Sequence, residues 1–146
     1  MPRAEPVGLV VFAHGSRVTA ANEAVRAVAR EASRRAGFGV YRTAFLELAD
    51  PTLAAAVAQI AATGVRRVLV TPYFLTMGRH LTEDLPRLVE AIRSEHPELA
   101  LECAPPLDGH PALAGILADR AQALLEGPPT EAATHERPRR PDAATE

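Results

Sequence analysis

The sequence predicts an α/β fold with a four-stranded parallel sheet that is doubly wound, in the flavodoxin-like strand order 2-1-3-4. Four short segments of apolar and β-branched residues alternate with four longer amphipathic segments along 146 residues. Such alternation is typical of β-α units with helices on both faces of one sheet. Right-handed crossovers then favour the order 2-1-3-4.

The expected strands share a high content of apolar and β-forming residues. They span residues 7–13, 40–46, 68–71 (within the segment 67–74) and 99–103. The first of them, Val7–Ala13, is apolar throughout. A continuous apolar run is expected of a strand that is buried on both faces.

The expected helices show apolar residues three and four positions apart. The first carries such a stripe at Val25, Val28, Ala29 and Ala32 and is ended by Gly37. In the second, Asp50 is expected to cap the helix and Pro51 to occupy its first position. The third is marked by Leu85, Leu88, Val89 and Ile92 and stops before Pro97, and the fourth spans residues 111–125.

Composition narrows the class of protein. A net charge of −2 gives no basic field for nucleic acid, and no apolar run is long enough to cross a membrane. Residues 1–6 have no apolar core of a signal peptide, so none is expected. The single cysteine cannot form an internal disulfide, which favours the reducing cytoplasm. We expect one α/β domain over residues 1–126 and a disordered tail without chemistry over residues 127–146.

Polar residues follow each expected strand. His14 follows the first strand, Glu47 the second, His80 a long loop after the third, Tyr73–Leu81, and His110 the fourth. Ligands of open parallel sheets bind beyond the carboxyl ends of the strands. We therefore expect His14, Glu47 and His80 to share one rim, and we treat His110 as a helix-entry residue.

Each of these residues also has a plainer interpretation. His14 can cap a loop, Glu47 can be a solvated loop residue, and His80 can be an ordinary loop residue. Two imidazoles and a carboxylate nevertheless suit a divalent ion such as Co²⁺, Fe²⁺, Ni²⁺ or Zn²⁺. Three ligands would leave coordination positions open, so the ion would be transient or catalytic. No nucleophile elbow, P-loop or dinucleotide fingerprint is present.

Four segments together resemble the class II sirohydrochlorin chelatases. They are FAHGSR at 12–17, AFLELADP at 44–51, TPYFLTMGRH at 71–80 and APPLDGHP at 104–111, and the likeness runs from about Val7 to about Leu125. The resemblance implies a chelatase-like α/β domain that inserts Co²⁺ or Fe²⁺, in some members Ni²⁺, into sirohydrochlorin. These reactions serve the synthesis of cobalamin, sirohaem or coenzyme F430.

The resemblance also implies roles for residues. It makes His14 and His80 the metal ligands, with Glu47 beside them, and treats the metal as a substrate rather than a permanently bound cofactor. Many members carry two such domains, and the small form forms a homodimer, so a homodimer is implied here.

Substrate contacts are expected around the same rim. Sirohydrochlorin carries several carboxylates, for which Ser16, Arg17 and Arg79 would provide donors. Phe74 and Met77 would offer a flat apolar contact, or else pack in the core or at a dimer interface. A neutral imidazole can act as ligand or base.

Two other functions fit parts of the pattern. A non-catalytic protein that carries a tetrapyrrole or delivers a metal would use the same ligands. A histidine phosphatase needs an arginine directly before its nucleophilic histidine, and Ala13 stands there.

Overall fold

A computed structural model describes residues 5–127 of the chain. The chain divides into two compact units between Asp108 and Gly109, which we describe separately. The first unit holds the four-stranded parallel sheet, and its order, β2-β1-β3-β4, is the one that the sequence predicts. The tail predicted for residues 127–146 lies, beyond Gly127, outside the described residues.

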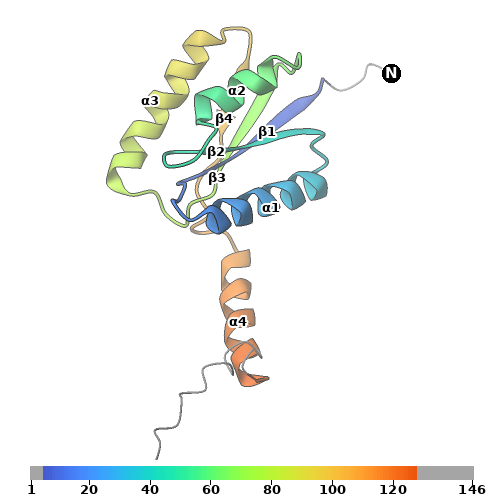
Figure 1. The fold of residues 1–146 in the computed structure, drawn as a ribbon, viewed down its shortest axis with the longest axis vertical. Helices are drawn as coiled ribbons and strands as arrows, with labels where there is room; N and C mark the ends of the chain where they lie inside the picture. Colours follow the sequence, from blue (N-terminus) through green and yellow to red (C-terminus); the bar gives the residue numbers. More distant parts are fainter. Residues whose placement is uncertain (1–4, 128–146) are drawn as a thin grey trace, which may run out of the picture. The chain divides into compact units, whose positions relative to one another are not determined.

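Strands and helices alternate in the first unit (Figure 1). They are β1 (Val7–Ala13), α1 (Thr19–Ala36), β2 (Val40–Phe45), α2 (Leu53–Ala61), β3 (Arg67–Pro72), α3 (Arg79–Glu95) and β4 (Ala100–Cys103). The strand boundaries agree with the predicted ones within two residues.

The register of the sheet brings three strand ends together. β1 lies between β2 and β3, with Ala13 opposite Phe45 and Phe12 opposite Pro72. Because all the strands are parallel, the segments that follow β1, β2 and β3 leave from the same edge of the sheet. This edge is the rim on which the sequence places His14, Glu47 and His80.

The main core lies between the sheet and helices α2 and α3. It includes Val10 and Phe12 of β1, Ile60 of α2 and Ile92 of α3, each at most 2% exposed. Burial of such side chains contributes about 1.5–3 kcal/mol each. Residue Gly8 lets α2 approach closely, since a Cβ there would lie 2.6 Å from a methyl carbon of Ile60.

Helix α1 is less buried than its pattern predicts. Its buried residues are Asn22, Ala29 and Ser33, whereas Val28 is 43% exposed. Val28 and Ala32 line an apolar depression of about 350 Å³ that also contacts β1 and β3. Half of the predicted stripe is therefore not covered within residues 5–108.

Two predicted helix starts are wrong. The second helix begins at Leu53 and not at Pro51, because the Thr52 side chain caps it by accepting a hydrogen bond from the Ala55 N–H (3.2 Å). The third begins at Arg79, so His80 lies in the first turn of a helix instead of in a loop.

The second unit contains α4 (Ala112–Leu125), close to the predicted 111–125. The His110 Nδ1 accepts a hydrogen bond from the Ala112 N–H at 3.0 Å. This contact is what the sequence predicted for a helix-entry residue.

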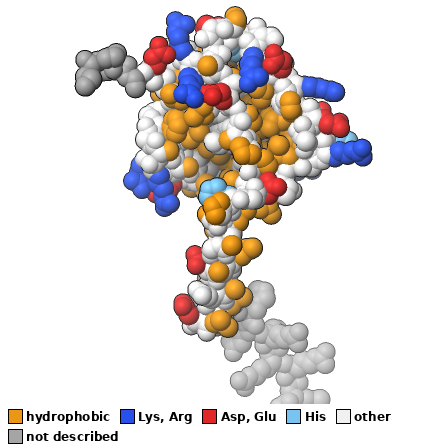
Figure 2. All heavy atoms as spheres, turned by 180° about the vertical axis from the view of Figure 1, so that it is seen from behind, with side chains coloured by type: hydrophobic (Ala, Val, Ile, Leu, Met, Phe, Trp, Pro, Cys, Tyr) orange, Lys and Arg blue, Asp and Glu red, His pale blue; other side chains and the backbone are white. Residues whose placement is uncertain are grey.

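The surface of the described part is mixed. Figure 2 shows hydrophobic side chains gathered on one face, with arginine and acidic side chains nearer its margin. Within residues 5–127, no helix has the length and apolar character needed to span a membrane.

Candidate metal site at the carboxyl edge of the sheet

His14 and Glu47 face each other at the rim. His14 directly follows β1, and its Nε2 lies 3.6 Å from Oε1 of Glu47, in the segment after β2. Both side chains are more than half exposed, at 59% and 57%. The imidazole Nδ1 lies 3.1 Å from the Gly15 carbonyl oxygen. An imidazole nitrogen and a carboxylate oxygen at this distance are too far apart for a hydrogen bond but can bind one metal ion between them.

Backbone hydrogen bonds fix this pair beyond the ends of the strands. The Leu46 N–H donates to the Ala13 carbonyl at 2.9 Å, and the Glu47 N–H donates to the His14 carbonyl at 3.1 Å. They continue the pairing of β1 with β2 for two residues. The extended pairing of β1 with β2 therefore places Glu47 next to His14.

Gly15 allows the two segments to approach. Its φ is +91°, and a Cβ built on it would lie 1.8 Å from the Glu47 carbonyl oxygen. Only glycine tolerates both conditions. On the opposite segment Leu48 has a φ of +64°, a conformation that is uncommon for residues other than glycine. The contact of the two loops thus needs a glycine on one side and a strained turn on the other.

Asn22 holds the loop that follows His14. Its side chain accepts a hydrogen bond from the Ser16 N–H at 3.0 Å and donates one to the Ser16 carbonyl at 2.8 Å. Asn22 is only 8% exposed, and each such bond contributes about 1 kcal/mol. Sequence reasoning missed this residue, although a polar amide on the inner side of an apolar helix was an available signal.

Phe74 forms an aromatic wall beside His14. Its ring meets the Phe12 ring edge-on at 5.7 Å and the His14 ring at 6.4 Å. The segment that carries it is tied down, since the Leu107 N–H donates to the Phe74 carbonyl at 2.9 Å. Both Phe74 and Met77 pack against the main core, which is the alternative considered for them from the sequence.

The remaining predicted site residues on the rim do not form a cluster with His14 and Glu47. Arg17, two residues before α1, and Arg79 and His80, in the first turn of α3, have exposed side chains. In residues 5–127 no group of three or more His, Cys, Asp or Glu side chains is close enough to hold a metal ion. The structure brings His14 to Glu47 but does not place His80 in a three-residue cluster with them.

The single cysteine is not an activated thiolate. Cys103 lies at the end of β4, and burial raises the pKa of its thiol, an effect that the charge of Arg93 only partly offsets. A raised pKa keeps the neutral thiol at neutral pH, whereas metals bind the thiolate.

Comparison with known proteins gives a consistent family. The CbiX family model matches residues 8–124. A sirohydrochlorin cobaltochelatase of Methanococcoides burtonii is 29% identical over 83% of this chain and 98% of its own length. A chloroplastic sirohydrochlorin ferrochelatase of Arabidopsis thaliana is 30% identical over 81% of this chain, but the match covers only 52% of the plant protein.

Solved structures share the fold. A putative cobalamin biosynthesis CbiX protein from Marinobacter aquaeolei is 30% identical, with a TM-score of 0.74, over 83% of this chain and 98% of its own. The chelatase SirB from Bacillus subtilis, solved with cobalt, has a TM-score of 0.76 at 21% identity, and this chain covers 51% of it. The chain thus matches the Methanococcoides and Marinobacter proteins along nearly their whole length, and it matches the Arabidopsis and Bacillus proteins along about half of theirs.

The family model covers most of the chain, and the sheet order and both solved structures agree with it. The chain therefore belongs to the CbiX family, the class II sirohydrochlorin chelatases that four of its sequence segments resemble.

Proposed function

We propose that this protein is a chelatase that inserts a divalent metal into sirohydrochlorin. The candidate metals are Co²⁺ and Fe²⁺, with Ni²⁺ as a third. The observation that carries the proposal is the pairing of His14 with Glu47 at the sheet edge, 3.6 Å apart and open to solvent. Family membership supports the tetrapyrrole, because the relatives in Methanococcoides and Arabidopsis are named for chelation of sirohydrochlorin.

The chemistry requires two exchanges. The ring gains one metal ion and loses two pyrrole N–H protons, so the site must both release a cation and accept protons. In our proposal His14 and His80 bind the incoming metal, and Glu47 accepts protons and offsets the cationic charge. A neutral imidazole is a common ligand of divalent metals such as these, and a carboxylate offsets their charge.

The surrounding residues would orient the macrocycle. Arg17 and Arg79 have exposed guanidinium groups, which bind carboxylates in bidentate fashion, and Ser16 adds a further donor. The Phe74 ring, edge-on to His14, gives the macrocycle an apolar surface close to the metal. Met77, which packs on the core, would contribute less contact.

Catalysis is expected to appear as repeated turnover. Purified protein mixed with an excess of sirohydrochlorin and Co²⁺ should form many equivalents of metallated product per chain, well above the uncatalysed rate. Absorbance of the metallated macrocycle measures the rate, and parallel reactions with Fe²⁺ and Ni²⁺ rank the metals. At most one equivalent of product per chain would instead identify a tetrapyrrole carrier or a metal-delivery protein.

We further propose that the protein acts as a homodimer in the cytoplasm. The larger relatives contain about twice the length that this chain matches, and a second copy would supply a comparable second unit. The single cysteine suits a reducing compartment. Light scattering after size exclusion is expected to give the mass of two chains, and the mass of one chain would contradict the dimer.

A further inference from the structure

We propose that Arg26 is a positioning residue that holds the turn carrying Glu47 opposite His14. This inference rests on the proposed function, in which Glu47 accepts protons from the macrocycle. Arg26 lies on α1, outside all four segments that resemble the chelatases, and no role was expected of it from the sequence.

One side chain contacts both ends of the turn. The guanidinium carbon of Arg26 lies 5.2 Å from the centroid of the Phe45 ring, directly before the turn. Its Nη2 donates to the Asp50 carbonyl at 3.3 Å, directly after the turn. The four residues between, 46–49, include Glu47, so Arg26 spans the segment that sets the position of this carboxylate.

The turn needs such support. Glu47 is more than half exposed, and its side chain has His14 as its ion-pair partner, so its position depends on the backbone beneath it. The next residue, Leu48, has the strained φ of +64°. A strained turn keeps its conformation only when its surroundings fix it. Phe45, at 1% exposure, is a rigid base on which the Arg26 guanidinium rests.

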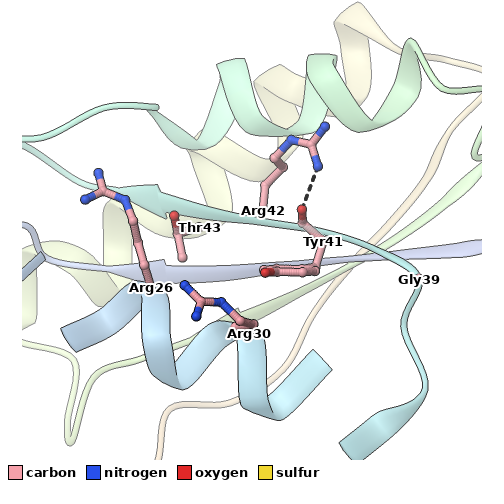
Figure 3. A pocket seen from close by; sticks show the side chains of 6 residues that line it. All are labelled: Arg26, Arg30, Gly39, Tyr41, Arg42 and Thr43. Carbon is pink, nitrogen blue, oxygen red and sulfur yellow. Dashed lines mark hydrogen bonds between the residues drawn. The ribbon is translucent and has the colours of Figure 1, made fainter. Parts of the chain in front are cut away.

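The guanidinium is itself held in place. Its Nη1 donates to Oε1 of Glu23, one turn earlier on α1, at 2.5 Å. Figure 3 shows Arg26 and Arg30 projecting from α1 beside β2, where they line a shallow depression together with Arg42, Tyr41 and Thr43. Within residues 5–127, the contacts to Phe45 and Asp50 come from Arg26 and not from Arg30. Arg30 is therefore a matched control of the same type on the same helix.

A substrate-binding role is the competing interpretation of Arg26. A guanidinium near the rim can bind a carboxylate of the macrocycle, and its loss would then raise KM. A positioning role predicts a different pattern, because misplacement of Glu47 weakens proton acceptance in the transition state and lowers kcat.

Kinetics of Arg26→Ala separate the two roles. We expect kcat to fall about tenfold with KM for sirohydrochlorin unchanged, and Arg26→Lys, which keeps a cation over Phe45, to recover part of the loss. Arg30→Ala should retain wild-type kinetics. The double variant Arg26→Ala/Glu47→Gln should be no slower than Glu47→Gln alone, because Arg26 acts through Glu47. A raised KM, or equal losses with and without Glu47, would overturn the inference.

Hydrogen exchange gives a readout that does not depend on turnover. The Glu47 amide donates to the His14 carbonyl at 3.1 Å, and we expect it to exchange faster in Arg26→Ala than in wild type or Arg30→Ala. Unchanged exchange would overturn the positioning role even if the protein is an active chelatase. If wild type shows no turnover, the proposed function fails, and the exchange result alone still decides whether Arg26 holds the turn.

Discussion

Replacing His14 by alanine is expected to reduce metal insertion by about a hundredfold or more, since the variant loses a metal ligand and the imidazole that faces Glu47. The fold should survive, because the His14 side chain is 59% exposed and belongs to neither core cluster. Turnover with Co²⁺ measures the loss, and a melting curve that matches wild type shows that the structure is intact. Titration with Co²⁺ in the absence of sirohydrochlorin should show weaker binding.

Two further histidines complete this experiment. His80→Ala is expected to behave like His14→Ala, because both imidazoles are proposed to bind the metal. His96→Ala is the control, since His96 caps the far end of α3 and its Nδ1 lies 3.7 Å from Glu98. Near-normal turnover in His14→Ala would show that the metal binds elsewhere on the chain. An effect of His14 without an effect of His80 would leave His14 and Glu47 as the working pair.

The sequence predicted the sheet well because the signal is strong. A strand buried on both faces, such as Val7–Ala13, needs an apolar residue at every position, and few other structures accept that pattern. Parallel register then places His14 and Glu47 at one edge without knowledge of any side-chain contact. Their proximity follows from strand order, and the 3.6 Å distance adds detail to it.

Helix boundaries were predicted less well because the competing choices differ little in energy. Asp50 and Thr52 are both good capping residues, and a cap is worth about 1 kcal/mol. Within the fold, the Pro51 carbonyl accepts a hydrogen bond from the N–H of Phe45, the last residue of β2. The helix then starts after Thr52. Tertiary contacts of this kind decide between caps and are invisible in a local pattern.

Residues that support the site were missed for a related reason. Asn22 acts on a residue six positions away and Arg26 on one 24 positions away, and neither spacing is a motif. Both lie on α1, where the apolar periodicity predicts that valines and alanines face the sheet and gives no role to the polar residues. The buried side of α1 nevertheless includes Asn22, so polar residues of this helix also help to shape the ligand-binding edge.

Gly15→Ala is expected to have the second large effect, on both stability and activity. The added Cβ would lie 1.8 Å from the Glu47 carbonyl oxygen, which belongs to the backbone and cannot rotate away. To relieve this contact the two loops must separate, which breaks the hydrogen bond from the Glu47 N–H to the His14 carbonyl and moves the carboxylate away from the imidazole. We expect the free energy of unfolding to fall by about 3 kcal/mol and metal insertion to be nearly lost.

Gly64→Ala separates the clash from the backbone conformation. Gly64 has a φ of +90°, almost the same as the +91° of Gly15, but a Cβ there meets nothing within 4 Å. It lies after α2, at the amino end of β3 and away from the rim. Gly64→Ala therefore carries only the left-handed strain, about 1–2 kcal/mol, and should turn over normally. Urea denaturation and turnover of both variants give the comparison. Equal destabilisation with equal activity would mean that the His14 and Glu47 loops do not need their close contact, whereas a larger loss in Gly15→Ala would locate the requirement at the Glu47 carbonyl.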